Sequence, residues 1–273
     1  MNNVNASAFK ELQASPSKEG RFEYEIFPRF QPIVDYKKNS VECVEALARW
    51  NHPRDGVCVP EPLIAQIDNP AFALEVDRCI YSSTVRTVSM ANIGVNWPWL
   101  TALNLSSERL EDPELIGEFE RSCIPPASFV IEILETTSVE HASDRALGNL
   151  EDLKSLGVQI ALDDFGTGFS SVHALTTLCP DIVKIPRQFV RHIHTSLKAM
   201  DIFKSLVDIS KASGARVIAE GVETKEQADI ATDLGCDLLQ GFYFSPPLDP
   251  SKVQDFIVRT TRMSGFSCQL RLI

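Results

Sequence analysis

The feature that most limits the possible folds is a repeated alternation of short apolar segments with longer helical patterns. Each apolar segment is rich in β-branched residues and short enough to be a strand. The expected strands are Arg29–Val34, Val41–Leu47, Thr101–Leu105, Phe129–Ile133, Val158–Leu162, Ile182–Ile185, Arg216–Ala219 and Leu238–Phe242. Because strands that alternate with helices usually form parallel sheets, the chain is expected to have an α/β fold.

Apolar residues between these strands recur with helical spacing. The clearest series are Ala146, Leu150, Leu153 and Ile202, Leu206, Ile209. Pro60 is expected to begin a helix, and Gly157 and Gly214 are expected to end helices before the next strand. Eight such strands, without a glycine-rich dinucleotide fingerprint after the first, favour a (β/α)8 TIM-type barrel over a doubly wound sheet. The short connection Asp35–Asn39 predicts that the first two strands form an antiparallel hairpin.

Composition and charge restrict the function classes. The formal net charge of -11 gives no general electrostatic surface for nucleic-acid polymers or anionic membranes. No apolar run is long enough to span a bilayer, and the start of the chain lacks a signal-peptide core. The 7 cysteines include no C-x-x-C pair, which favours reduced, mostly buried thiols and a cytoplasmic location. We expect a flexible N-terminal tail at 1–20, one barrel at 21–262 and a C-terminal tail at 263–273.

Polar residues occur where the expected strands end, although a buried core would not favour them there. These residues are Glu45, Asn104, Glu132, Glu135, Asp163, Asp164, Lys184, Glu220 and Gln240. In a parallel barrel the strand ends share one face, and that face carries catalysis. Burying so many carboxylates together is costly unless cations neutralise them. The sequence therefore predicts a polar, cation-binding site at this face.

The residue types indicate which cations and which chemistry to expect. Oxygen ligands without histidine or cysteine select hard cations such as Mg²⁺ or Mn²⁺. The consecutive Asp163 and Asp164 suit two metals bridged by one oxygen, an arrangement that activates water for in-line phosphoryl displacement. Lys184 would add a positive charge beside the water or the phosphate. A simpler alternative stays open, because both aspartates could cap the next helix.

A set of short motifs occurs in the order found in one known family. They are Q-P-I-V at Gln31–Val34, E-A-L-A-R-W-N-H-P at Glu45–Pro53, N-L-S at Asn104–Ser106, D-D-F-G-T-G at Asp163–Gly168, A-E-G-V-E-T at Ala219–Thr224 and Q-G-F at Gln240–Phe242. On these motifs almost the whole chain, residues 22–256, resembles a stand-alone EAL domain. The resemblance implies a (β/α)8 barrel with an antiparallel first strand and hydrolysis of cyclic di-GMP to linear pGpG.

The resemblance also implies a role for each site residue. The ligands of a first Mg²⁺ or Mn²⁺ would be Glu45, Asn104, Glu132 and Asp163. The ligands of a second ion would be Asp163, as a bridge, with Asp164 and Glu220. The catalytic residues would be Lys184, Glu220 and Glu135, of which Glu135 anchors the loop after the fourth strand. The substrate-binding residues would be Gln31 and Arg49, with Glu223 and Gln240 in supporting or guanine-side positions.

Two further expectations concern assembly and a rival function. The resemblance implies a homodimer formed through the loop and helix after Asp163-Asp164 and the loop after Glu135. The sixth-strand motif reads K-I-P where the family has K-I-D, so Pro186 replaces an acidic residue. This departure leaves open a catalytically weak cyclic di-GMP receptor. A protein-interaction module has less support, because the substrate-binding residues Gln31 and Arg49 are retained. A Mg²⁺-dependent enolising barrel also has less support, because the sequence offers no obvious second basic residue opposite Lys184.

Overall fold

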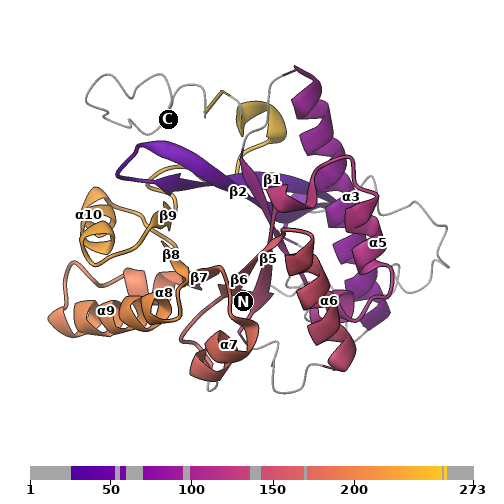
Figure 1. The fold of residues 1–273 in the computed structure, drawn as a ribbon. Helices are drawn as coiled ribbons and strands as arrows, with labels where there is room; N and C mark the ends of the chain where they lie inside the picture. The colour runs from indigo at the N-terminus through magenta and orange to yellow at the C-terminus, as the bar shows by residue number, and fades with distance from the viewer. Residues whose placement is uncertain are drawn as a thin grey trace.

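The strands of the protein close into a barrel. The computed structural model describes residues 26–52, 56–59, 70–94, 99–135, 143–168, 171–253 and 255–256. The strands are β1 (Ile26–Asp35), β2 (Ser40–His52), β3 (Gly56–Cys58), β4 (Leu100–Asn104), β5 (Phe129–Leu134), β6 (Gln159–Asp163), β7 (Ile182–Ile185), β8 (Arg216–Ala219) and β9 (Leu238–Gln240). Their order is β1-β9-β8-β7-β6-β5-β4-β2-β3, and a β1–β2 pairing closes the ring. The predicted TIM-type barrel is confirmed (Figure 1).

The first strand runs against its neighbours, as the short connection predicts. β1 pairs antiparallel with both β2 and β9, whereas the pairings from β2 through β4 to β9 are parallel. The hairpin turn occupies the four residues between Asp35 and Ser40, and Asn39 adopts a positive φ of 51° there. Asparagine tolerates this left-handed conformation, which suits a tight connection between antiparallel strands.

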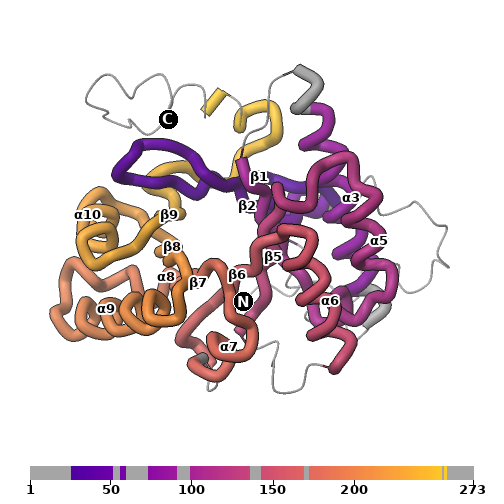
Figure 2. The backbone as a smooth tube through the Cα atoms, viewed as in Figure 1, coloured from indigo at the N-terminus to yellow at the C-terminus, as the bar shows by residue number. Residues whose placement is uncertain are grey.

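Helices surround the barrel on the outside (Figures 1 and 2). They are α3 (Pro70–Gly94), α4 (Ser107–Leu110), α5 (Leu115–Glu120), α6 (Asp144–Ser155), α7 (Ser171–Leu178), α8 (Arg187–Val190), α9 (Leu197–Ala212) and α10 (Lys225–Asp233), with a 3-10 turn at Pro126–Ser128. Side chains at the helix starts fix several boundaries. Thr224 forms a capping box with Gln227 at α10, and Ser143 and Ser196 cap α6 and α9. The predicted helix ends at Gly157 and Gly214 have φ values of 88° and 89°.

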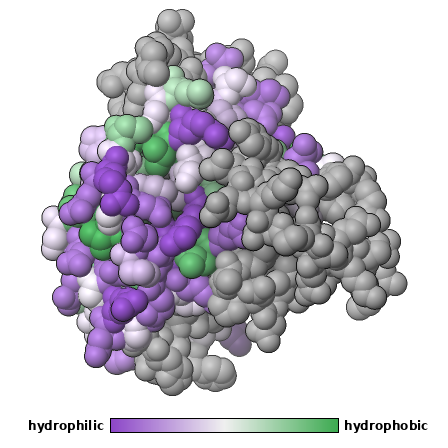
Figure 3. All heavy atoms as spheres, turned by 90° about the vertical axis from the view of Figure 1, so that its right-hand side faces the viewer, coloured by the Kyte–Doolittle hydropathy of each residue, from purple (hydrophilic) through white to green (hydrophobic). Residues whose placement is uncertain are grey.

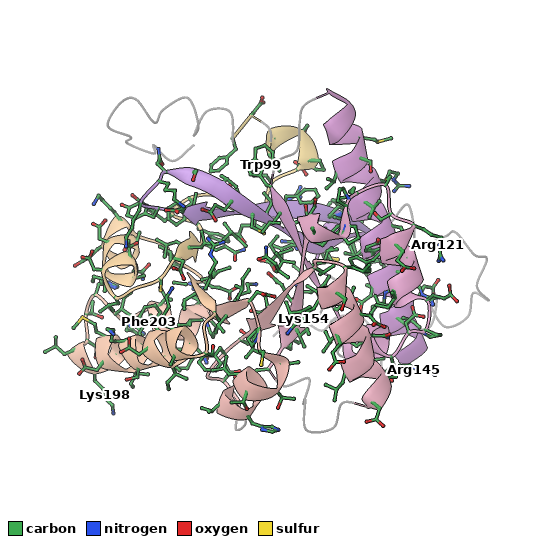
Figure 4. All side chains as sticks on the ribbon, viewed as in Figure 1. Trp99, Arg121, Arg145, Lys154, Lys198 and Phe203 are labelled. Atoms are coloured by element: carbon green, nitrogen blue, oxygen red, sulfur yellow. The ribbon has the colours of Figure 1, made fainter. Side chains whose placement is uncertain are left out.

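One predicted helix presents a different face to the core. Ile202 and Ile209, which belong to the apolar series at helical spacing, are 43% and 41% exposed. The buried residues of α9 are Phe203, Val207 and Ser210. Figure 4 shows Lys198 of the same helix pointing away from the barrel. The predicted helix is confirmed. Phe203 and Val207 fill the space against the sheet, and Leu206 of the first apolar series packs at the edge of this buried face.

The predicted end of the last strand and the predicted burial of most cysteines are wrong. The last strand ends at Gln240 rather than Phe242, because Gly241 turns sharply against the backbone of Val222. Of the described cysteines, Cys43 and Cys236 are buried while Cys123 and Cys179 are exposed, so most of these thiols are not deeply buried. None of the described cysteines forms a disulfide. Among the described residues, none of the helices is both long and apolar enough to cross a bilayer. Pro60 lies outside the described residues, and the boundaries of the two tails stay predictions.

Candidate active site at the carboxyl ends of the strands

The barrel interior contains an apolar layer and, above it, a polar layer. The apolar layer is one cluster of buried side chains, one from each strand of the ring: Ile33, Cys43, Ala102, Val130, Ala161, Ile182, Ile218 and Leu238. Side chains alternate between the two faces of a strand, so the residue two positions further on also points inward. Those residues are Gln31 on the reversed β1, then Glu45, Asn104, Glu132, Asp163, Lys184, Glu220 and Gln240. The predicted site is therefore assembled at one end of the barrel.

Lys184 lies at the centre of the polar layer. Its side chain is only 1% exposed, and its Nζ lies 2.8 Å from an oxygen of Glu132 and 2.8 Å from an oxygen of Glu220. Asp163 and Glu45 follow at 3.5 Å and 3.7 Å. One ammonium group thus contacts four carboxylates that come from four different strands or strand ends.

Amide side chains connect the remaining members of the layer. Asn104 donates a hydrogen bond of 3.1 Å to Glu45. The amide nitrogen of Gln240 donates to Glu45 at 2.6 Å and to Gln31 at 3.2 Å, and Gln31 donates to the backbone carbonyl of Ser245 at 3.0 Å. The oxygen of Gln240 is buried without a hydrogen-bond partner among the described residues. A buried acceptor of this kind calls for a donor from a bound molecule or water.

Three carboxylates lie close enough to share a metal ion. Ligand oxygens of Asp163, Asp164 and Glu220 all lie within 4.8 Å of one another. Asp164 has a positive φ of 56°, and its backbone N–H donates to its neighbour Asp163 at 2.8 Å. The helix-capping alternative for the two aspartates is wrong, because the next helix begins only at Ser171. The strained backbone at Asp164 instead aims consecutive carboxylates at one point.

Burial and crowding change the protonation of this cluster. Burial raises the pKa of Glu220 to about 8, since the charges of Asp163 and Glu45 offset the attraction of Lys184. Burial, with repulsion from Glu45, also raises the pKa of Glu132 well above its ordinary value. Burial alone would lower the pKa of Lys184, but the surrounding carboxylates raise it well above the ordinary value. Lys184 is therefore a permanent cation, and the carboxylates compete for it.

Glu135 lies outside the polar layer and holds a loop. Its carboxylate accepts hydrogen bonds from the backbone N–H groups of Gly166 at 2.8 Å and Thr167 at 3.2 Å. A Cβ on Gly168 would lie 2.5 Å from the same carboxylate, so a larger residue there would displace the side chain of Glu135. Glu135 thus fastens the loop that follows Asp163 and Asp164. The loop after its own strand, which the sequence interpretation assigned to it, lies outside the described residues.

Two predicted substrate residues lie at the rim and not in the polar layer. The guanidinium of Arg49 donates to the backbone carbonyl of Ala48 at 2.6 Å. Glu223 forms an ion pair of 2.5 Å with Arg187. The sequence analysis did not single out Arg187, although a basic residue two positions after the strand that carries Lys184 was a usable signal. It also could not find the carbonyl of Ser245, because every residue has one.

Pro186 occupies the junction between β7 and α8. It is buried, it adopts φ -71° and ψ 158°, and it stands at the N-cap of α8 without a side-chain hydrogen bond. Lys184 nevertheless keeps its contacts with four carboxylates. The missing acidic side chain is therefore not needed to place the lysine.

The fold and the site define a class, a (β/α)8-type barrel with a carboxylate-rich centre at the carboxyl ends of its strands. The family model of the EAL domain matches residues 18–247, so the chain belongs to the EAL domain family. It is 29% identical over 250 residues to the bifunctional diguanylate cyclase/cyclic di-GMP phosphodiesterase MucR of Pseudomonas aeruginosa, covering 90% of this chain and 36% of the relative. The chain thus spans about a third of the length of this curated relative.

Solved structures agree with this membership. A MucR phosphodiesterase in complex with c-di-GMP superposes with a TM-score of 0.79 at 27% identity, covering 90% of this chain and 99% of that chain. A manganese and cyclic di-GMP complex of Klebsiella pneumoniae BlrP1 superposes with a TM-score of 0.70 at 30% identity, covering 86% of this chain and 58% of that chain.

Proposed function

We propose that the protein hydrolyses one phosphodiester bond of cyclic di-GMP and releases linear pGpG. The observation that carries this proposal is the charge imbalance of the site. Glu45, Glu132, Asp163 and Glu220 contact one buried ammonium group. A fifth carboxylate, Asp164, lies beside Asp163 and Glu220. If all are ionised, five minus one leaves four negative charges, which two divalent cations would neutralise. Such a site is suited to a phosphodiester, because the same cations also bind the anionic oxygens of the phosphate.

The residues fit two hard cations. Glu45, Asn104, Glu132 and Asp163 would hold one ion, and Asp163, Asp164 and Glu220 would hold the other. All of these ligands offer oxygen atoms, which favours Mg²⁺ or Mn²⁺. When bound, a pair of such ions activates a water and neutralises the charge of the scissile phosphate. The manganese-containing complex of BlrP1 supports the choice of metal by similarity.

The protein's own groups have distinct tasks in the reaction. Lys184 stays protonated because carboxylates surround it, so it supplies a fixed positive charge beside the phosphate or the attacking water. Glu135 holds the loop of Asp163 and Asp164 in place. Water oxygen forms the new bond to phosphorus while the bond to the 3′ oxygen breaks and that oxygen takes up a proton. Because the bond to the 3′ oxygen breaks, the phosphate stays on the 5′ oxygen, and the product is the linear dinucleotide pGpG.

The direct test is incubation of the purified protein with cyclic di-GMP and Mg²⁺ or Mn²⁺, followed by chromatography of the nucleotides. We expect pGpG, and we expect its loss in EDTA and in a Glu45→Ala variant. Absence of product under all conditions, with intact binding by calorimetry, would instead favour the receptor, the second candidate suggested by Pro186. The undisturbed contacts of Lys184 favour the hydrolase.

We also propose that two chains assemble through α7 and the adjoining loops. Val172 on α7 is 59% exposed and Leu134 at the end of β5 is 42% exposed, and Glu135 joins these regions through the loop at 166–168. Exposed aliphatic side chains at this position are suited to an interface. Light scattering of the wild type should give the mass of a dimer, and a Val172→Glu variant should give a monomer. A monomeric wild type would contradict this assembly.

A further inference from the structure

The loops after β7 and β8 meet at the rim of the site. Arg187 begins α8 directly after Pro186, and its aliphatic stem packs on Gly221, where an added Cβ would lie 2.3 Å from the Cβ and Cγ of the arginine. Gly221 follows Glu220, which contacts Lys184 at 2.8 Å. Arg187 is therefore held by packing against Gly221, the residue next to Glu220 of the carboxylate cluster.

The charged ends of this contact are open to solvent. The guanidinium of Arg187 pairs with Glu223 at 2.5 Å, while the two side chains are 60% and 40% exposed. The backbone of Glu223 is fixed, because its N–H donates to Gln227 at 2.7 Å and Gln227 donates to the carbonyl of Arg191 at 3.2 Å. An exposed pair of this kind contributes little to stability, so a ligand can separate it at little cost while both backbones stay in place.

An exposed aromatic ring belongs to the same rim. Phe242 is 60% exposed and is the only phenylalanine among the described large hydrophobic side chains that are exposed. Its loop is tied to the loop after β8, because Val222 donates to the carbonyl of Gln240 at 3.0 Å and Tyr243 donates to the carbonyl of Val222 at 3.0 Å. Val222 directly precedes Glu223. An aromatic ring, a carboxylate and a guanidinium thus lie on adjoining loops.

We propose that Arg187 determines base specificity by reading one guanine of the substrate together with Glu223, while Phe242 stacks on that base. The inference rests on the proposed function. A guanidinium fork fits the O6 and N7 acceptors of guanine, and a carboxylate accepts from its N1–H and N2–H groups. Adenine presents a donor where guanine has O6, so the same arginine rejects it. Stacking on an aromatic ring tolerates any base.

The test compares cyclic di-GMP with cyclic di-AMP in the presence of Mn²⁺. For Arg187→Met we expect KM for cyclic di-GMP to rise about 10- to 100-fold, the range for one bidentate base contact, with little change in kcat. The preference for guanine over adenine should fall by the same factor. Arg187→Lys should recover part of the loss, because lysine keeps the charge without the fork. Arg191→Met, an exposed arginine of the segment that follows α8, is the matched control and should behave as wild type.

The outcomes separate this inference from the proposed function. If the wild type hydrolyses cyclic di-GMP but Arg187→Met keeps the same base preference, or loses kcat equally with both nucleotides, the inference is overturned and the function stands. If the wild type binds cyclic di-GMP without hydrolysing it, dissociation constants of the same variants for the two nucleotides decide whether Arg187 sets the base preference. If the wild type neither hydrolyses nor binds, both are overturned. Phe242→Ala should weaken both nucleotides about equally, and a loss confined to guanine would contradict the stacking role.

Discussion

Two groups of buried charge in this protein differ in their balance. Near α4 and α5, Arg109 and Asp112 are each 1% exposed and are paired with each other and with Arg78 and Glu118. Two guanidinium groups there face two carboxylates, and Arg109 also lies 6.0 Å from the ring centroid of Tyr81. At the carboxyl ends of the strands, by contrast, five carboxylates cluster near one ammonium group, which contacts four of them.

Net charge separates a structural group of buried charges from a functional one. A balanced cluster satisfies its own charges and needs nothing else, so its role is to join α3, α4 and α5 (Figure 1). An unbalanced cluster is unfavourable until a cation arrives, and it persists because the barrel around it supplies the stability. Both clusters contain fully buried charges, Arg109 and Asp112 in one and Lys184 and Glu132 in the other, so burial alone does not distinguish them. Their net charges do.

The largest effect should come from removing a carboxylate of the unbalanced cluster. Glu132→Gln deprives the site of a ligand, and metal assistance contributes several kcal/mol to such reactions, so turnover should fall about 1000-fold. The free energy of unfolding without metal should stay equal or rise, because repulsion with Glu45 is relieved. Product chromatography and denaturant titration measure the two quantities. A strongly destabilised metal-free variant would show that the carboxylate is structural.

The balanced cluster should respond in the opposite way. Arg109→Met leaves Asp112 and Glu118 with a single partially exposed guanidinium, and breaking a buried pair costs about 3–5 kcal/mol. The free energy of unfolding should fall by this amount with or without metal, while kcat of the remaining folded enzyme should not change. Denaturant titration of the variant beside Lys198→Met, an exposed lysine of α9, provides the control. A change below 1 kcal/mol would remove the distinction between the two clusters.

Addition of metal should stabilise the unbalanced cluster and leave the balanced one unchanged. Mn²⁺ at 100 times its dissociation constant should stabilise the wild type by about 2.7 kcal/mol per site. Glu132→Gln should gain less, whereas Arg109→Met should gain as much as the wild type, because only the first variant alters the unbalanced cluster. Thermal unfolding with and without EDTA measures the gain. Equal stabilisation of both variants would place the metal elsewhere.

The smallest effect should come from restoring the acidic residue after β7. Lys184 already contacts four carboxylates, so Pro186→Asp should change turnover by less than about tenfold, or 1.4 kcal/mol. Steady-state kinetics with cyclic di-GMP measures this change. A gain of 100-fold or more would show that the lost carboxylate limits catalysis and would favour the receptor for the natural chain.

Most of the site could be predicted from the sequence, because periodicity fixes which side chains point inward. Once Glu132 or Lys184 is placed at the end of a strand, alternation puts it above Val130 or Ile182. Contacts between loops could not be predicted in the same way. The pair of Arg187 with Glu223 depends on two loops that meet in space, and the buried face of α9 depends on whether Ile202 or Phe203 fits the outside of the barrel better. Neither is encoded in local spacing.

The unbalanced cluster is expected to bind two divalent cations. The most direct measurement is the number of Mn²⁺ ions bound per chain, determined by equilibrium dialysis and metal analysis on the wild type and on Glu132→Gln. We expect two ions in the wild type and fewer in the variant. A wild type that binds no Mn²⁺, or a variant that binds as many ions as the wild type, would contradict the account.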